Sequence, residues 1–107
     1  MAKSIVGKVT DFKPGTLNEV QLDGKIYAIA NVGGTFYAID GICGHASGGH
    51  LAQGQLIGET IKCPKHGAEY DLRTGKNLKK PWIPFSKANE LLTYTIRVEG
   101  DSVVLDI

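Results

Sequence analysis

The chain has 107 residues, of which 42% are hydrophobic and 21% are charged, and its net charge is +1 at neutral pH. This length allows one domain with one modest core, and the charge creates no general attraction for nucleic acid or a membrane surface. No stretch approaches the roughly 18 apolar residues that span a membrane, and the N-terminus lacks a signal peptide's apolar run. We therefore expect a single soluble, cytoplasmic domain over residues 1–107.

The first half of the chain contains strand patterns that are joined by glycine turns. Asp23-Gly24 has the composition of a tight two-residue hairpin turn, and Gly33-Gly34 turns the chain again. The strand patterns around these turns mix β-branched, aromatic and polar residues, and they occupy residues 4–12, 18–22, 25–32 and 35–40.

The second half begins with a glycine-rich loop over residues 41–50 and continues with hairpin patterns, of which the last closes the chain over residues 91–107. Residues 77–90 contain two prolines, which predicts a long loop, and no stretch predicts a helix of three or more turns. Short strands joined by glycine turns indicate an all-β fold, an antiparallel β-sandwich or small barrel. In such a fold, two loops that are distant in sequence can lie together at one end.

Each of the two cysteines is followed closely by a histidine. Cys43 and His45 form a C-x-H motif, and after seventeen residues Cys63 and His66 form a C-x-x-H motif. Nothing indicates secretion, so a disulfide is not expected. A cysteine and a histidine on one tight loop aim a thiolate and an imidazole in the same direction, and two such loops supply four ligands. The pattern therefore predicts a metal site.

Two metal groups compete for this ligand set. Zinc accepts two cysteines and two histidines in a tetrahedron, and a Rieske-type [2Fe–2S] cluster takes the same four ligands. Zinc-finger sequences place a cysteine pair before a histidine pair, whereas here each loop carries one of each. The arrangement favours a dinuclear cluster, although ligand identity alone does not separate the two.

The segments "CGH" and "CPKHGAEYDLRTGK" resemble the signature of the Rieske family, and the likeness to soluble Rieske-type ferredoxins extends over nearly the whole chain. The resemblance implies a Rieske-like fold whose two cluster-binding loops cover about residues 41–51 and 62–71. It also implies a Rieske-type [2Fe–2S] cofactor. Cys43 and Cys63 would bind the buried iron, and His45 and His66 the outer iron near solvent.

The resemblance also indicates a set of residues around the cluster: Gly44, Pro64, Lys65, Gly67, Ala68, Tyr70 and Trp82. High-potential members of the family carry a serine where this chain has Ala68, whose methyl group cannot donate a hydrogen bond to the cluster. Tyr70 is kept, and Trp82 lies in a proline-containing loop of the kind that covers the cluster. We therefore expect a potential toward the low side of the Rieske range, roughly −150 to 0 mV.

The resemblance implies an electron carrier rather than an enzyme. Only His50 would remain to build the mononuclear iron site of a Rieske oxygenase, which needs two histidines and a carboxylate. The expected partners are a flavin-dependent ferredoxin reductase and a terminal oxygenase, both bound transiently by a monomer. The alternatives are the small subunit of a nitrite reductase and, in a different class, a zinc-stabilised binding module without a redox role.

Two features have an ordinary reading and a functional one. His50 is expected to be a surface residue, because a four-ligand cluster has no vacancy for it. Between residues 62 and 80 the chain carries six Lys and Arg residues against two acidic ones. That stretch is either a solvated rim or a docking surface for an acidic partner, and the second reading predicts salt-sensitive association.

Overall fold

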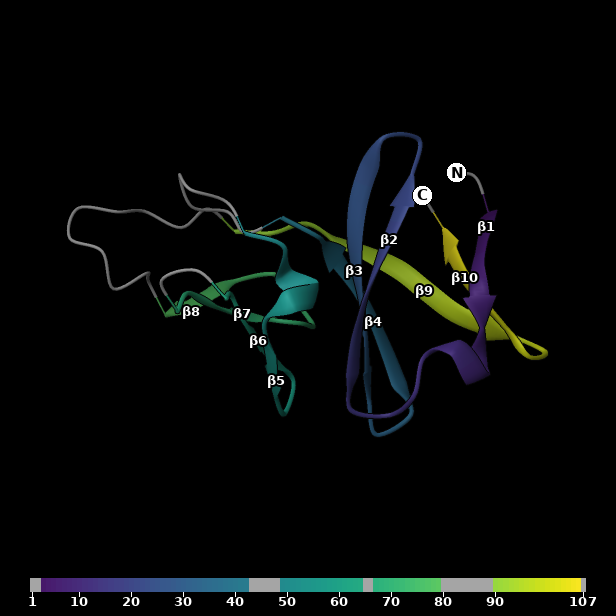
Figure 1. The fold of residues 1–107 in the computed structure, drawn as a ribbon, viewed down its shortest axis with the longest axis horizontal. Helices are drawn as coiled ribbons and strands as arrows, with labels where there is room; N and C mark the ends of the chain where they lie inside the picture. Colours follow the sequence, from purple (N-terminus) through teal and green to yellow (C-terminus); the bar gives the residue numbers. More distant parts are fainter. Residues whose placement is uncertain (1–2, 43–48, 65–66, 80–89, 107) are drawn as a thin grey trace.

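The structure, a computed structural model, describes residues 3–42, 49–64, 67–79 and 90–106. These residues form two antiparallel sheets, a larger and a smaller one, drawn side by side in Figure 1. The larger sheet has the strand order β1-β10-β9-β4-β3-β2. In chain order its strands are β1 (Lys3–Lys8), β2 (Thr16–Leu22), β3 (Lys25–Val32), β4 (Thr35–Asp40), β9 (Thr93–Glu99) and β10 (Ser102–Asp106).

The smaller sheet is inserted between β4 and β9 and has the order β5-β6-β7-β8. Its strands are β5 (Gln55–Ile57), β6 (Thr60–Lys62), β7 (Glu69–Asp71) and β8 (Asn77–Lys79). Two single turns of 3₁₀-helix complete the described chain, η1 (Val9–Asp11) and η2 (Leu51–Gln53). The all-β antiparallel prediction is confirmed, and no helix in the described ranges is long and apolar enough to cross a membrane.

The predicted hairpin turns are present, and their backbone angles explain the residues found there. Asp23 and Gly24 have φ values of 49° and 78°, so both central residues of the β2–β3 turn are left-handed. That conformation matches the twist of the two flanking strands and selects the sequence Asp-Gly. One expectation needs correction: residues 77–79, assigned to a long loop, form β8, because Tyr70 of β7 pairs with Asn77 there.

The hydrophobic core of the described residues consists of two clusters of buried side chains. One lies within the larger sheet and contains Phe12, Tyr27, Ile29, Ala38, Val103 and Leu105. The other joins the two sheets and contains Ala28, Ala30, Ile39, Leu51, Ile61, Cys63, Ala68, Tyr70, Leu72 and Leu91; we call it the intersheet cluster. Strand β3 has side chains in both clusters, which is why residues 27–30 are all buried.

Candidate metal centre

The second predicted loop is a tight connection between β6 and β7. The backbone N–H of Cys63 donates to the carbonyl oxygen of Ala68 at 2.7 Å, which closes the loop at its base. Gly67 has a φ of 71°, a left-handed conformation that glycine adopts without steric cost. The "CPKHG" segment therefore ends in glycine because the chain must reverse before Ala68 to enter β7.

Cys63 is a buried residue beside an open hollow. It is 2% exposed and belongs to the intersheet cluster with Ala68 and Tyr70, which are both fully buried. Cys63 also lines a hollow of about 390 Å³, together with Gln53, Gly54, Gln55, Lys62, Pro64 and Gly67. A thiol between a dry core and a hollow fits a group that binds through sulfur, because the apolar side excludes water and the hollow leaves room for the group.

The first predicted loop also has a closed base. Ile42 and His50 pair as an isolated antiparallel bridge, and the N–H of Leu51 donates to the carbonyl oxygen of Gly41 at 2.9 Å. Leu51 is fully buried in the intersheet cluster, which also contains Cys63 and Ala68. The bases of the two loops therefore meet in one core.

A third segment is attached to the same core. Leu91, which follows the proline-containing segment, is buried in the intersheet cluster, and its N–H donates to the carbonyl oxygen of Gly75 at 2.8 Å. Several predicted residues lie outside the described ranges: Cys43, Gly44, His45, Lys65, His66 and Trp82. The described members of the predicted site are Cys63, Pro64, Gly67, Ala68 and Tyr70, with Pro64 exposed.

His50 lies at the surface, as expected, and it has a partner that the sequence did not indicate. Its Nδ1 is 2.5 Å from Oε1 of Glu19 on β2, and the two side chains are 44% and 38% exposed.

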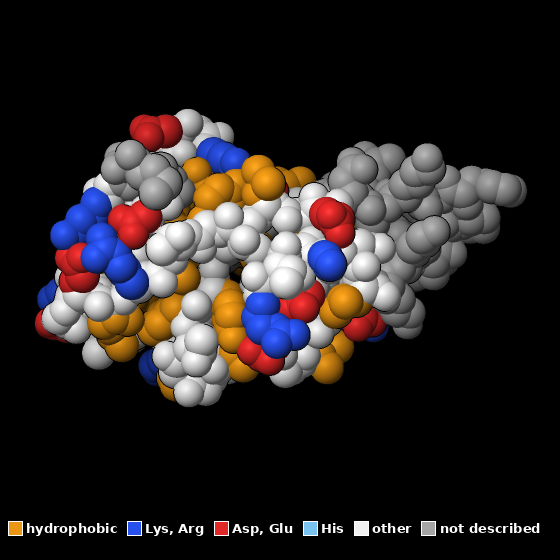
Figure 2. All heavy atoms as spheres, turned by 180° about the vertical axis from the view of Figure 1, so that it is seen from behind, with side chains coloured by type: hydrophobic (Ala, Val, Ile, Leu, Met, Phe, Trp, Pro, Cys, Tyr) orange, Lys and Arg blue, Asp and Glu red, His pale blue; other side chains and the backbone are white. Residues whose placement is uncertain are grey.

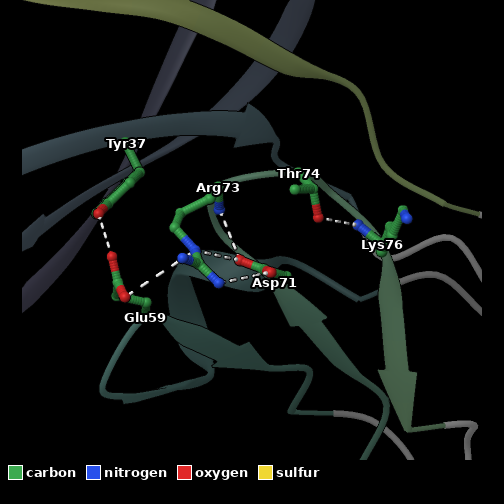
Figure 3. A network of polar contacts seen from close by, with 6 residues as sticks. All are labelled: Tyr37, Glu59, Asp71, Arg73, Thr74 and Lys76. Atoms are coloured by element: carbon green, nitrogen blue, oxygen red, sulfur yellow. Dashed lines mark hydrogen bonds and ion pairs between the residues drawn. The ribbon is translucent and has the colours of Figure 1, made fainter.

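The basic stretch is less one-sided than its sequence suggests. Figure 3 shows Arg73 reaching toward Asp71 and Glu59, and its Nε lies 3.4 Å from Asp71 Oδ1 and 4.0 Å from Glu59 Oε1. The backbone N–H of Arg73 is the main cause of a lowered pKa for Asp71, followed by its side chain. Within the described part of the stretch, Lys62 and Lys76 form no ion pair. The charge of Arg73 is therefore offset, while those of Lys62 and Lys76 are not.

The same network connects the two sheets. The hydroxyl of Tyr37 on β4 donates to Oε2 of Glu59, in the β5–β6 turn, at 2.5 Å (Figure 3). The hydrogen bond to Glu59 is the main cause of a raised pKa for Tyr37. Sequence reasoning missed this contact because neither residue belongs to a motif.

A family model for the Rieske [2Fe-2S] domain matches residues 2–104 of the chain. The ferredoxin component of the naphthalene 1,2-dioxygenase system of Pseudomonas putida is 32% identical over 99 residues, which cover 92% of this chain and 89% of that protein. The ferredoxin subunit of the 3-phenylpropionate/cinnamic acid dioxygenase of Escherichia coli K12 is 37% identical over 77% of this chain and 73% of its own.

Solved structures agree with these relatives. The ferredoxin of carbazole 1,9a-dioxygenase from Nocardioides aromaticivorans IC177 matches with a TM-score of 0.85 and 26% identity, over 98% of this chain and 97% of its own. A ferredoxin chain in a complex of reduced oxygenase and oxidized ferredoxin of carbazole 1,9a-dioxygenase matches with a TM-score of 0.82 and 28% identity, over 96% and 91%.

The chain belongs to the Rieske [2Fe-2S] domain family. Within it the chain is a ferredoxin, an electron carrier that works with an enzyme rather than as one, and its cofactor is a Rieske-type [2Fe–2S] cluster. The resemblance predicted from the two motifs is confirmed, and the zinc module is set aside.

Proposed function

We propose that Cys43 and Cys63 bind the inner iron of the cluster and that His45 and His66 bind the outer iron. The supporting observation is the placement of Cys63, 2% exposed in the core that also holds the base of the first loop. The bound cluster accepts and releases one electron at a time. The chain's own task is to hold the four ligands and keep water from the sulfides.

The described residues around Cys63 serve that task in different ways. Gly67 reverses the chain, and Pro64, with its fixed φ, restricts the backbone next to the thiolate. Ala68 packs its methyl group in the core and supplies no hydroxyl donor, so the potential falls toward the low side of the range, roughly −150 to 0 mV. A redox titration with a midpoint well above +100 mV would contradict this assignment.

We infer that the chain passes electrons from a flavin-dependent reductase to a terminal oxygenase. The relatives named above are ferredoxin components of dioxygenase systems, and a similar ferredoxin has been solved in complex with its oxygenase. We further propose a cytoplasmic monomer, where a reducing compartment keeps both thiols available to iron. Encounters of this kind have small interfaces, below about 1,200 Å².

Replacement of three of the four proposed ligands tests the site. Cys63→Ser, His45→Ala and His66→Ala should each abolish the visible absorption of the cluster and release its acid-labile sulfide, because each removes an iron ligand. Glu99→Gln, which changes a charged residue of the larger sheet, should keep both signals. The ligand assignment fails if any of the three ligand variants retains a full Rieske spectrum.

A further inference from the structure

The contact between His50 and Glu19 joins the first loop to the larger sheet. His50 lies at the C-terminal end of the first loop, where it pairs with Ile42 across the loop's base. Glu19 lies at the middle of β2, the edge strand of the sheet. With Nδ1 of His50 and Oε1 of Glu19 2.5 Å apart, the two side chains form a direct bridge between these elements.

Small side chains on β3 allow η2 to lie close to the larger sheet beneath this bridge. Leu17 and Glu19 project from the same face of β2, since side chains two apart on a strand share a face. Their partners on β3 are Ala30 and Ala28, which are 0% and 1% exposed. The small alanine side chains leave room for Leu51 of η2, and Leu17 packs against the same cluster.

The base of the loop also has backbone attachments among the described residues, since the N–H of Gly41 donates to the carbonyl oxygen of Ile26 on β3 at 2.9 Å and Ile42 pairs with His50. Leu51 is held by its burial and by one hydrogen bond from its N–H to the carbonyl oxygen of Gly41. In the described part of this base, the side chain of His50, the residue before Leu51, contacts a carboxylate of the larger sheet. Opening of the base at His50 therefore separates this imidazole from Glu19.

We propose that Glu19 and His50 are positioning residues that hold the base of the first cluster loop against β2. The inference rests on the proposed function, in which Cys43 and His45 on this loop bind the cluster. The pair holds the described base of that loop, at His50 and Leu51, against the core that also contains Cys63. Its role is local, so its removal changes how often the loop base opens rather than whether the domain folds.

The size of the effect follows from the exposure of the pair. Both side chains are more than a third exposed, so solvent screens their attraction. Pairs of this exposure typically shift an opening equilibrium by roughly one-and-a-half- to fivefold. Local opening controls both the exchange of the amide hydrogens at the base and the escape of a bound group.

Hydrogen exchange and cluster loss in the cluster-loaded protein test the proposal. Glu19→Gln should speed exchange at the Leu51 amide and the first-order loss of visible absorption, each by about one-and-a-half- to fivefold. The matched control is Glu99→Gln, which removes a carboxylate 36% exposed and paired with Lys3 on the same sheet. The control should leave both rates unchanged.

A donor substitution separates positioning from general stability. The amide nitrogen of asparagine occupies nearly the position of histidine Nδ1, so His50→Asn should keep most of the wild-type rates, whereas His50→Ala should match Glu19→Gln. Adding Glu19→Gln to His50→Ala should have no further effect. The proposal is overturned if Glu19→Gln exchanges at the wild-type rate, if Glu99→Gln has the same effect, or if the two substitutions add.

Cluster absorption and Leu51 exchange together distinguish a failure of the positioning role from a failure of the proposed ligands. Wild-type protein that never shows a cluster spectrum would overturn the proposed ligands and, with them, the role of the loop. Normal cluster loading combined with unchanged Leu51 exchange in Glu19→Gln would overturn the positioning role alone.

Discussion

Gly75 shows how strictly a single residue is specified near the metal centre. Its φ is 77°, and a Cβ placed there would lie 1.9 Å from the carbonyl oxygen of Leu91. Its own carbonyl oxygen accepts the N–H of Leu91. Gly75 therefore allows the chain beyond β7 to lie directly against Leu91, which is buried beside Cys63.

Gly75→Ala should destabilise the protein by more than the strain of its backbone conformation. Gly24 is the matched control, because its φ is 78° and a Cβ there meets nothing within 4 Å. Gly24→Ala should cost about 1–2 kcal/mol in free energy of unfolding. Gly75→Ala should cost clearly more, since the backbone must also move. Denaturant unfolding measures both, and equal losses would show that the contact with Leu91 relaxes freely.

At the level of single residues, the closed turn of the second loop could be predicted. The "CPKHG" spacing required a tight turn, and the structure closes that turn with the Cys63–Ala68 hydrogen bond. The need for Gly75 was not predicted, because the clash that selects it comes from Leu91, sixteen residues away. Contacts between distant segments leave no pattern in one sequence.

At the level of elements, the hairpins could be predicted and the contact between the sheets could not. The turn at Asp23-Gly24 is local, and its residues determine its geometry. Strand β8 was missed because its three residues precede two prolines and are too few to establish an alternation, and only pairing with β7 makes them a strand. The Tyr37–Glu59 contact likewise depends on how two separate sheets pack.

Tyr37 and Glu59 should be coupled, because they join β4 to the β5–β6 turn (Figure 3). A double-mutant cycle with Tyr37→Phe and Glu59→Gln should give a favourable interaction energy, because either substitution removes the same hydrogen bond. Tyr37→Phe keeps the ring, so packing against the intersheet cluster is unchanged. Additive losses of unfolding free energy would mean that the contact does not hold the sheets together.

The end of the larger sheet away from the metal centre has a pH-dependent pair of its own. Figure 2 shows basic and acidic side chains gathered together there, and Arg97 Nε lies 2.9 Å from Asp106 Oδ2. The hydrogen bond from Arg97 is the main cause of a pKa for Asp106 below its usual value of 3.8. A lowered folded pKa stabilises the folded state above the unfolded pKa, and this stabilisation is lost as the pH falls through the folded value.

The stability difference between wild type and Arg97→Gln should therefore shrink as the pH falls. It should be largest near about pH 6 and should shrink as the pH falls below the unfolded pKa of Asp106, where the unfolded chain takes up the proton before the folded wild type does. Comparison of two proteins at each pH removes the effect of acid on the cluster, which both share. A difference that stays constant over this range would show that Arg97 acts through packing rather than charge.

For the whole molecule, the question is how an almost neutral protein docks to a partner. Among the described residues of the basic stretch, Arg73 is offset by Asp71 and Glu59, whereas Lys62, next to Cys63 at the hollow, forms no ion pair. If charge guides docking, electron transfer to the oxygenase should slow as salt rises above about 0.1 M, where the screening length is about 10 Å.

Lys62→Gln should lower the rate at low salt by about two- to threefold and weaken its salt dependence, because a charge at an interface rim acts mainly on association. Arg73→Gln should change the salt dependence less. Stopped-flow reduction of the oxygenase at several salt concentrations measures both. Identical salt dependence in wild type and Lys62→Gln would identify the basic stretch as a solvated rim.

The central claim is that two cysteines and two histidines on adjoining loops hold a [2Fe–2S] cluster that carries single electrons. Its most direct test is electron paramagnetic resonance of the dithionite-reduced protein. The protein is expressed once with and once without ¹⁵N-labelled histidine. We expect a Rieske-type signal with coupling to two histidine nitrogens that changes with the label. A colourless protein containing zinc, or a reduced cluster without nitrogen coupling, would contradict the claim.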